Sequence, residues 1–212
     1  MLKILNKTRK VSGKMSVPKQ IMTTFFALLF GGGMGIVAKF LDLNRLPSFL
    51  DWLDLSNFLG RTAPRIFIAV CLAVFSKSPL KAGINVFAFF AGMVVSYYLY
   101  SNYVAGFFPR SYAMIWVGFT MISPFLAFVC WYAKGKSRPA FMLSVLILAV
   151  LFNMTFVYGW GYFEARSVLE LIVFIIGLTV LRRDTLKSSV LMGTISIVFA
   201  FLLDMVIPFH FG

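Results

Sequence analysis

Long unbroken runs of apolar residues constrain this chain more than any other feature. The stretch from Arg61 to Arg110 contains two of them, at about 61–76 and 80–101, joined by the short basic turn Ser76-Lys77-Ser78-Pro79. As helices, the first run would extend about 24 Å, slightly less than the hydrocarbon core of a bilayer, and the second is long enough to cross it with tilt. We therefore predict a helical hairpin in a lipid bilayer at the centre of the fold.

Further apolar runs of similar length occupy most of the remaining sequence. The 212 residues are 60% hydrophobic and only 13% charged, whereas a soluble domain is closer to half apolar and a quarter charged. Continuous runs also differ from the short alternating strands of a membrane β-barrel. The sequence thus predicts an all-α, polytopic membrane bundle, with a basic tail at 1–19 and a single transmembrane domain at 20–212. The seven predicted spans are about 20–41, 61–76, 80–101, 112–132, 139–158, 165–181 and 189–207.

Basic residues lie mostly on one side of the predicted bundle. The tail and the loops at 77–81, 134–138 and 182–187 contain fourteen of the twenty Lys and Arg residues but one of the seven acidic residues, Asp184. Because cytoplasmic loops are enriched in Lys and Arg, we predict an N-in/C-out protein of the bacterial inner membrane. The net charge of +13 then reports the orientation of the chain in the membrane and does not indicate nucleic-acid binding. The basic residues would also contact anionic lipid on the cytoplasmic face.

A short polar segment separates the first two spans. In residues 49–59, Trp52 and Leu59 stand at roughly helical spacing against Asp51 and Asp54. The segment is too short and too polar to cross a bilayer, so we predict an amphipathic helix at the extracytoplasmic interface, with Trp52 against apolar surface. An ordinary ordered loop is the alternative.

Small and amide residues inside the spans predict contacts between helices. Stripes of small residues let two helix backbones approach closely in a membrane, and amide side chains within a span favour hydrogen bonds between helices. The small residues are the pair Gly31 and Gly35 and the stripe Ala88, Gly92 and Ser96, and the amides are Asn85 and Asn153.

Glu170 is the residue whose position most suggests function. It lies inside the sixth predicted span, between Leu169 and Leu171. An ionised carboxylate near the centre of a membrane helix costs roughly 2.5–3.5 kcal/mol, so Glu170 should face the bundle and pair with a cation. Arg166, one turn earlier, and Arg65 are the partners that the sequence favours.

Charged residues on the extracytoplasmic side could form a ligand site. Concave sites with a few convergent charges in an apolar frame bind small solutes. The alternative is that these charges are snorkelling helix ends and intramembrane salt bridges, and this interpretation is favoured for Arg45, Arg61 and Arg110. The candidate pocket residues are Lys39, Arg65, Arg166, Glu170 and Asp204, with aromatic walls from Tyr97, Tyr98 and Trp160.

The sequence gives catalysis and cofactor binding little support. His210 is the single histidine, and Cys71 and Cys130 lie inside apolar runs with no metal-binding spacing. Nucleophilic catalysis needs a base beside Ser or Cys, and metal chemistry needs several ligands within reach. We therefore predict no metal, no cofactor and no catalytic residue.

Several local features resemble small, uncharacterised bacterial families of multi-pass membrane proteins. These are the glycine-rich first helix ending in Lys39-Phe40-Leu41-Asp42, the turn Ser78-Pro79-Leu80-Lys81, the helix end Ser96-Tyr97-Tyr98 and the helix start Phe163-Glu164-Ala165-Arg166. The resemblance covers most of the chain but implies no activity. The size is also similar to that of the substrate-capturing subunits of vitamin uptake systems, which typically have six spans.

Two leading functional hypotheses follow from these features, and a membrane-embedded enzyme comes third. The first is a protein that binds or moves a small solute through an outward-facing polar pocket. The second is a non-transporting membrane partner, namely an assembly, immunity or regulatory subunit, which acts through helix contacts with another membrane protein or with its own copies. A buried, paired Glu170 without a cavity would favour the second hypothesis.

Overall fold

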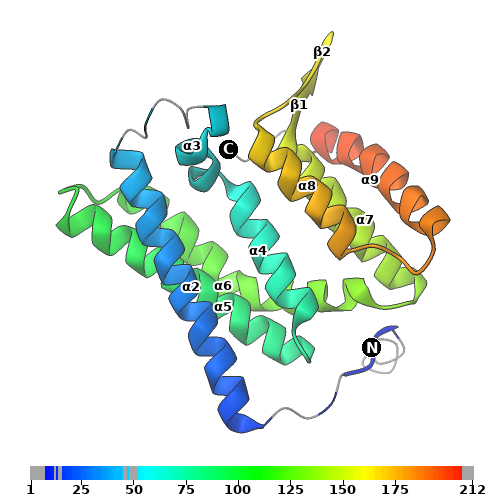
Figure 1. Cartoon of the computed structure of the whole chain (residues 1–212), viewed down its shortest axis with the longest axis horizontal. Coiled ribbons are helices and arrows are strands. Elements are labelled where there is room, and N and C mark those ends of the chain that lie inside the picture. The colour runs from blue at the N-terminus through cyan, green and yellow to red at the C-terminus, as the bar shows by residue number, and fades with distance from the viewer. Residues whose placement is uncertain (1–7, 12, 14–15, 45–46, 48–51, 207–212) are drawn as a thin grey trace. The chain divides into compact units, whose positions relative to one another are not determined.

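The computed structural model describes residues 8–11, 13, 16–44, 47 and 52–206, and these residues are mostly helical (Figure 1). A two-stranded antiparallel hairpin, β1 (Phe156–Gly159) and β2 (Tyr162–Ala165), interrupts the helices. The helices are α2 (Val17–Leu43), α3 (Leu55–Gly60), α4 (Thr62–Phe75), α5 (Pro79–Tyr103), α6 (Arg110–Trp131), α7 (Arg138–Thr155), α8 (Val168–Val180) and α9 (Leu186–Val206), with a 3₁₀ turn at Tyr132–Lys134.

Five of the described helices are long and apolar enough to span a membrane: α2, α5, α6 together with the 3₁₀ turn, α7 and α9. The helices α4 and α8 are apolar but shorter, with 14 and 13 residues. A helical membrane protein is therefore supported. The seven-span count and the orientation stay predictions.

The chain forms two compact units. One contains residues 11–47 and 69–131, and the other contains 48–68 and 132–212 together with the first ten residues; α4 contributes to both. The single transmembrane domain predicted for 20–212 is not tested by this division and stays a prediction.

In the unit of α2, α5 and α6, the predicted small-residue stripes pack against each other. A Cβ atom added to Gly31 would lie 1.9 Å from the Phe89 carbonyl oxygen, and one added to Gly92 would lie 2.2 Å from the Leu28 carbonyl oxygen. The Ser96 hydroxyl donates to the Gly32 carbonyl at 2.8 Å. Because no larger side chain fits at these distances, the prediction of close helix packing is confirmed.

The second unit has an aromatic core between α7, α8 and α9. Phe152 of α7 lies against Phe174 of α8 and Phe201 of α9, with ring centroids 5.7 and 6.2 Å apart. Asn153 Nδ2 donates to the Ala200 carbonyl at 3.0 Å. In the other unit, Asn85 accepts a hydrogen bond from Thr24 of α2, so both amides join helices as predicted.

The hairpin corrects two predicted helix boundaries. The span predicted at 139–158 ends as a helix at Thr155, and the span predicted at 165–181 begins at Val168. Phe156, Val157 and Tyr158 are β-branched or aromatic residues that favour a strand, and Gly161 supplies the positive φ of +85° that the turn requires. The aromatic segment after α7 is therefore a hairpin and not a helix end.

The predicted interfacial helix is shorter in the structure. Residues 49–51, including Asp51, lie outside the described residues, and helix α3 covers only Leu55–Gly60. Asp54 takes a left-handed backbone conformation with φ +49°, which blocks helix propagation from Trp52. Trp52 is 65% exposed, so the described residues leave most of it uncovered.

Candidate functional site

Arg61 joins two carboxylates at the centre of a polar network. Its Nη1 atom donates to Glu170 Oε1 at 2.9 Å, and its Nη2 atom donates to Asp54 Oδ2 at 3.2 Å. Asn57 Nδ2 also donates to Asp54 Oδ1 at 2.6 Å. The Glu170 side chain is 0% exposed and that of Arg61 is 23% exposed. We call Asp54, Asn57, Arg61, Ser167 and Glu170 the Arg61 network.

The sequence around Ser167 explains how Glu170 is held. Ser167 is the N-cap of α8, and its hydroxyl oxygen accepts from the Glu170 amide at 3.4 Å. The same hydroxyl donates to Glu170 Oε2. This is a variant of the capping box, in which a Ser and a Glu three residues later satisfy each other at a helix start. The positive end of the helix dipole also favours a carboxylate at this position.

The neighbouring backbone completes the local frame. The Thr155 hydroxyl donates to the Glu170 carbonyl at 3.3 Å, and the Arg166 amide donates to the Thr155 carbonyl at 2.9 Å. Arg65 is buried, and its Nη2 atom donates to the Leu59 carbonyl at 2.9 Å. These bonds connect the start of α8 to the end of α7 and fix α3 against the first turn of α4.

The cation that pairs with Glu170 differs from the prediction. The sequence favours Arg166 or Arg65, whereas the structure pairs Glu170 with Arg61. This salt bridge agrees with the interpretation favoured for Arg61, which was a snorkelling helix end or an intramembrane salt bridge. The reason is the helix boundary: α8 begins at Val168, so Glu170 lies in the first turn of the helix and not in its interior. Ser167 and Asp54 were also missed. The S-x-x-E spacing of Ser167 and Glu170 was the sequence signal that could have located this helix start.

A second polar group lies in the other unit, at the end of α2. Tyr97 donates from its hydroxyl to Asp42 Oδ2 at 2.9 Å, and Lys39 Nζ lies 3.7 Å from the same oxygen. The Lys39 ammonium also lies 5.2 Å from the centroid of the Tyr97 ring, a cation–π geometry. Tyr98 is buried, and its ring is edge-on to Tyr97 at 5.2 Å. Three predicted pocket residues, Lys39, Tyr97 and Tyr98, thus gather in this group.

The remaining predicted pocket residues lie in the unit that holds the Arg61 network. Arg65, Arg166 and Glu170 lie in or next to the network, whereas Trp160 forms the tip of the hairpin and is 104% exposed. Asp204 is half-buried near the end of α9. The predicted pocket residues therefore fall into two groups, one in each unit, and each group has its own charge pairs.

A basic clamp stands at the other end of the second unit. Arg183 donates to the carbonyls of Gly135, Ala133 and Ala140 at 2.6, 3.2 and 2.7 Å and to the Ser144 hydroxyl at 2.8 Å. The planar guanidinium can serve several oxygens at once, which an ammonium group cannot do in the same geometry. Arg183 therefore fixes the loop before α7 to the start of that helix.

Among the described residues, no three His, Cys, Asp or Glu side chains come together to hold a metal ion. The chain matches no protein-family model, no curated protein and no solved structure.

Proposed function

We propose that the chain is a seven-span protein of the bacterial inner membrane, N-in and C-out, that binds or transports a small charged solute at the Arg61 network. The observation that carries the proposal is the position of Glu170 in the first turn of a short apolar helix, where an ionisable side chain lies at membrane depth. Ionisable groups inside a membrane are costly and usually mark a solute or ion pathway.

The lengths of α4 and α8 support a membrane depth for the network. Arg61 directly precedes α4, and Glu170 lies in the first turn of α8. Helices of 14 and 13 residues extend about 20 Å, roughly 10 Å less than the hydrocarbon core. Both helices end at basic segments, Lys77 and Arg182-Arg183, which are predicted to be cytoplasmic. On this orientation the network lies in the outer half of the membrane, about 10 Å below its outer hydrocarbon boundary.

The chemistry of the network suits a charged solute. Helix starts within the membrane bind charged solutes in several transporter folds, because the free amides and the helix dipole point into the site. Glu170 can bind a cationic group and Arg61 an anionic group once the two separate from each other. A zwitterionic or cationic solute would then exchange with the internal ion pair.

One observation favours the second function, a non-transporting membrane partner. Both oxygens of Glu170 accept hydrogen bonds from within the unit, one from Arg61 and one from Ser167. A satisfied ion pair can simply join α3 to α8. In that case the helix faces would carry the function through contacts with another membrane protein or with further copies of the chain, while the basic side contacts anionic lipid.

A ligand screen on the purified full chain distinguishes the two functions. The melting temperature is measured in nanodiscs with added amino acids, small carboxylates and polyamines, for the wild type, for Glu170→Gln and for the control Asp184→Asn. Solute binding predicts that at least one class raises the melting temperature of the wild type and of Asp184→Asn but not of Glu170→Gln. If no class raises it, or if Glu170→Gln responds like the wild type, the partner function is favoured.

Accessibility of inserted tags tests the orientation separately. A tag in the 134–138 loop should be reached only from the cytoplasm, and one at the hairpin tip only from outside. Equal labelling of both sites from one side would show that the span count is wrong. The most direct explanation would then be that one of the short helices, α4 or α8, does not cross the membrane.

A further inference from the structure

The hairpin of β1 and β2 carries an exposed aromatic surface at its tip. Trp160 is 104% exposed, and Tyr162 and Phe163 are 53% and 56% exposed. Figure 1 shows the hairpin projecting past the ends of α7 and α8. A projecting aromatic surface on a folded unit marks a contact with lipid or with another molecule.

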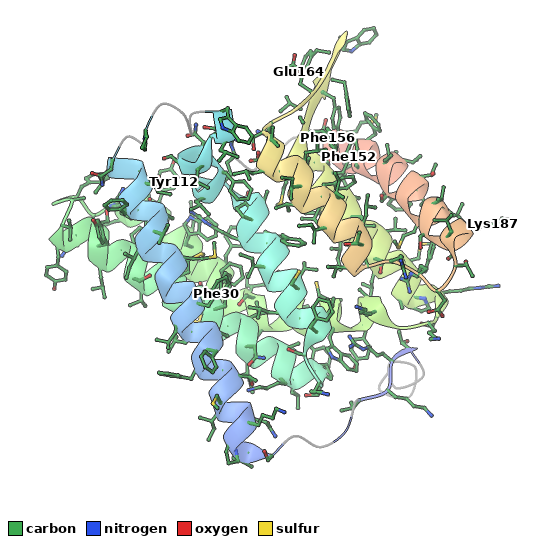
Figure 2. All side chains as sticks on the ribbon, in the orientation of Figure 1. Phe30, Tyr112, Phe152, Phe156, Glu164 and Lys187 are labelled. Atoms are coloured by element: carbon green, nitrogen blue, oxygen red, sulfur yellow. The ribbon has the colours of Figure 1, made fainter. Side chains whose placement is uncertain are left out.

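The base of the hairpin is packed rather than loose. Phe156 and Phe163 stack across the two strands with ring centroids 5.0 Å apart, and Phe156 lies 4.6 Å from Phe152 of α7. Tyr158 lies 4.6 Å from the ring of Phe201 in α9. Figure 2 shows Phe152 and Phe156 at the base and Glu164 farther out along the hairpin. This packing holds the tip at a fixed distance from the helix ends.

Two glycines shape the tip itself. Gly161 has φ +85°, which side-chain-bearing residues rarely adopt, and it completes the two-residue turn with Trp160. Gly159 faces Tyr162 across the strands, and a Cβ atom at Gly159 would lie 2.6 Å from the Tyr162 ring. The Tyr162 ring therefore lies over the glycine, which fixes its direction.

We propose that this tip is an interfacial anchor, with Trp160 and Tyr162 in the headgroup layer of the outer leaflet. The proposal rests on the orientation proposed above but not on solute binding. Helix α7, with 18 residues, extends about 27 Å, and the four-residue strands add about 13 Å. The tip thus lies about 40 Å from Arg138 at the start of α7. This distance matches the roughly 40–45 Å between the two headgroup surfaces of a bilayer.

The returning segment gives a second estimate of the depth. Helix α8, with 13 residues, extends about 20 Å, and the four residues of β2 add about 13 Å. The tip is therefore about 33 Å from the cytoplasmic end of α8, which is beyond the roughly 30 Å of the hydrocarbon core. A tilt near 20° would shorten both estimates by only a few Å and leave the tip above the hydrocarbon boundary.

The chemistry of the hairpin also fits the headgroup layer better than the hydrocarbon or bulk water. Trp and Tyr are the side chains enriched at membrane–water interfaces, because they combine an apolar ring with a polar group. A two-stranded hairpin leaves backbone groups unpaired along its outer edges, and such edges do not occur exposed to hydrocarbon. Residues 156–165 contain no Lys or Arg, so the anchor suits zwitterionic headgroups rather than anionic ones.

Fluorescence quenching in vesicles tests the anchor. The full chain is reconstituted in three kinds of phosphatidylcholine vesicle. The first contains no quencher, the second contains a lipid with a nitroxide on its headgroup, and the third contains a lipid with a nitroxide midway along its acyl chain. The contribution of Trp160 is the difference between the wild type and Trp160→Phe. Trp52→Phe, the same change at another exposed tryptophan, is the matched control, and Gly161→Val distorts the turn without removing the ring.

An anchor predicts that the Trp160 emission is shifted to the blue of a tryptophan in water. It also predicts that this emission loses more intensity with the headgroup quencher than with the acyl-chain quencher, and that Gly161→Val reduces the loss. An unquenched, unshifted signal would place the tip in water and overturn the anchor in favour of a protein contact. Stronger quenching by the acyl-chain lipid would overturn it in favour of a deeper hairpin. Orientation and solute binding are measured separately by the tags and the ligand screen, so their failure is distinguishable from failure of the anchor.

Discussion

The Arg61–Glu170 pair predicts an asymmetric response to removal of its two charges. Arg61→Gln leaves the Glu170 carboxylate buried at 0% exposure, with only the Ser167 hydroxyl and the helix start to stabilise it. Leaving a buried charge without its partner costs roughly 3–5 kcal/mol, and the two remaining contacts bring our expectation to about 3 kcal/mol.

Glu170→Gln should cost less. Arg61 would keep its ion pair with Asp54 at 3.2 Å and has 23% of its side chain exposed, so water can also solvate it. The glutamine can still accept from Ser167, and we expect a loss of about 1 kcal/mol. Because each single change breaks the same bond, the double variant should cost about 1–3 kcal/mol less than the sum of the two single changes.

The assay is reversible unfolding of the purified chain in mixed detergent micelles, with the wild type, both single variants and the double variant. Arg110→Gln, the same change at the exposed Arg that begins α6, is the matched control and should be close to neutral. Equal costs for Arg61→Gln and Glu170→Gln, or additive costs in the double variant, would refute the assigned pair. A larger coupling energy between Glu170 and Arg166, measured in the same kind of double-variant cycle, would make Arg166 the partner of Glu170, as the sequence favours.

Three further predictions concern packing and the basic side. Gly92→Ala should destabilise the chain by about 1–3 kcal/mol in the same unfolding assay, because its Cβ would lie 2.2 Å from the Leu28 carbonyl oxygen. Gly118→Ala is the control: a Cβ at Gly118 would have no atom within 4 Å, so this change should be neutral or stabilising. Arg183→Lys should lower the melting temperature by the equivalent of about 2 kcal/mol, since one ammonium cannot serve the four oxygens that Arg183 contacts, and a neutral result would show that the clamp is dispensable. The hydrogen bond from Lys136 lowers the pKa of Asp184, so this ion pair is formed at neutral pH and is lost only as the pH falls through the lowered pKa. Because both side chains are exposed, Asp184→Asn should leave the melting temperature at pH 7 nearly unchanged.

Properties that depend on local sequence were predictable here. Apolar runs fix where helices form, because a backbone in a bilayer must satisfy its own hydrogen bonds within each segment. The glycine and small-residue stripes were likewise visible, since the spacing of four residues places them on one helix face whatever the partner helix is. The contact of Gly31 with Phe89 and the hydrogen bond of Asn153 to α9 agree with those predictions.

The hairpin shows where composition misled the prediction. Residues 156–165 are as aromatic and apolar as a helix end, and hydropathy alone extended the spans into them on both sides. Their propensity for strands becomes decisive only when Phe156 and Phe163 stack across the turn and pack on α7. The signals for the turn and the cap were the glycine at 161 and the S-x-x-E spacing at 167–170.

The sequence by itself determined that this is a helical protein with several apolar helices of membrane length, and approximately where those helices lie. Both follow from residues close together in the chain. The partner of Glu170 was decided only by the tertiary structure, because Arg61 is 109 residues away and the sequence alone does not rank it against Arg65 or Arg166. Which of them reaches the carboxylate depends on where α3 ends and α8 begins, and on how the folded unit brings those two ends together.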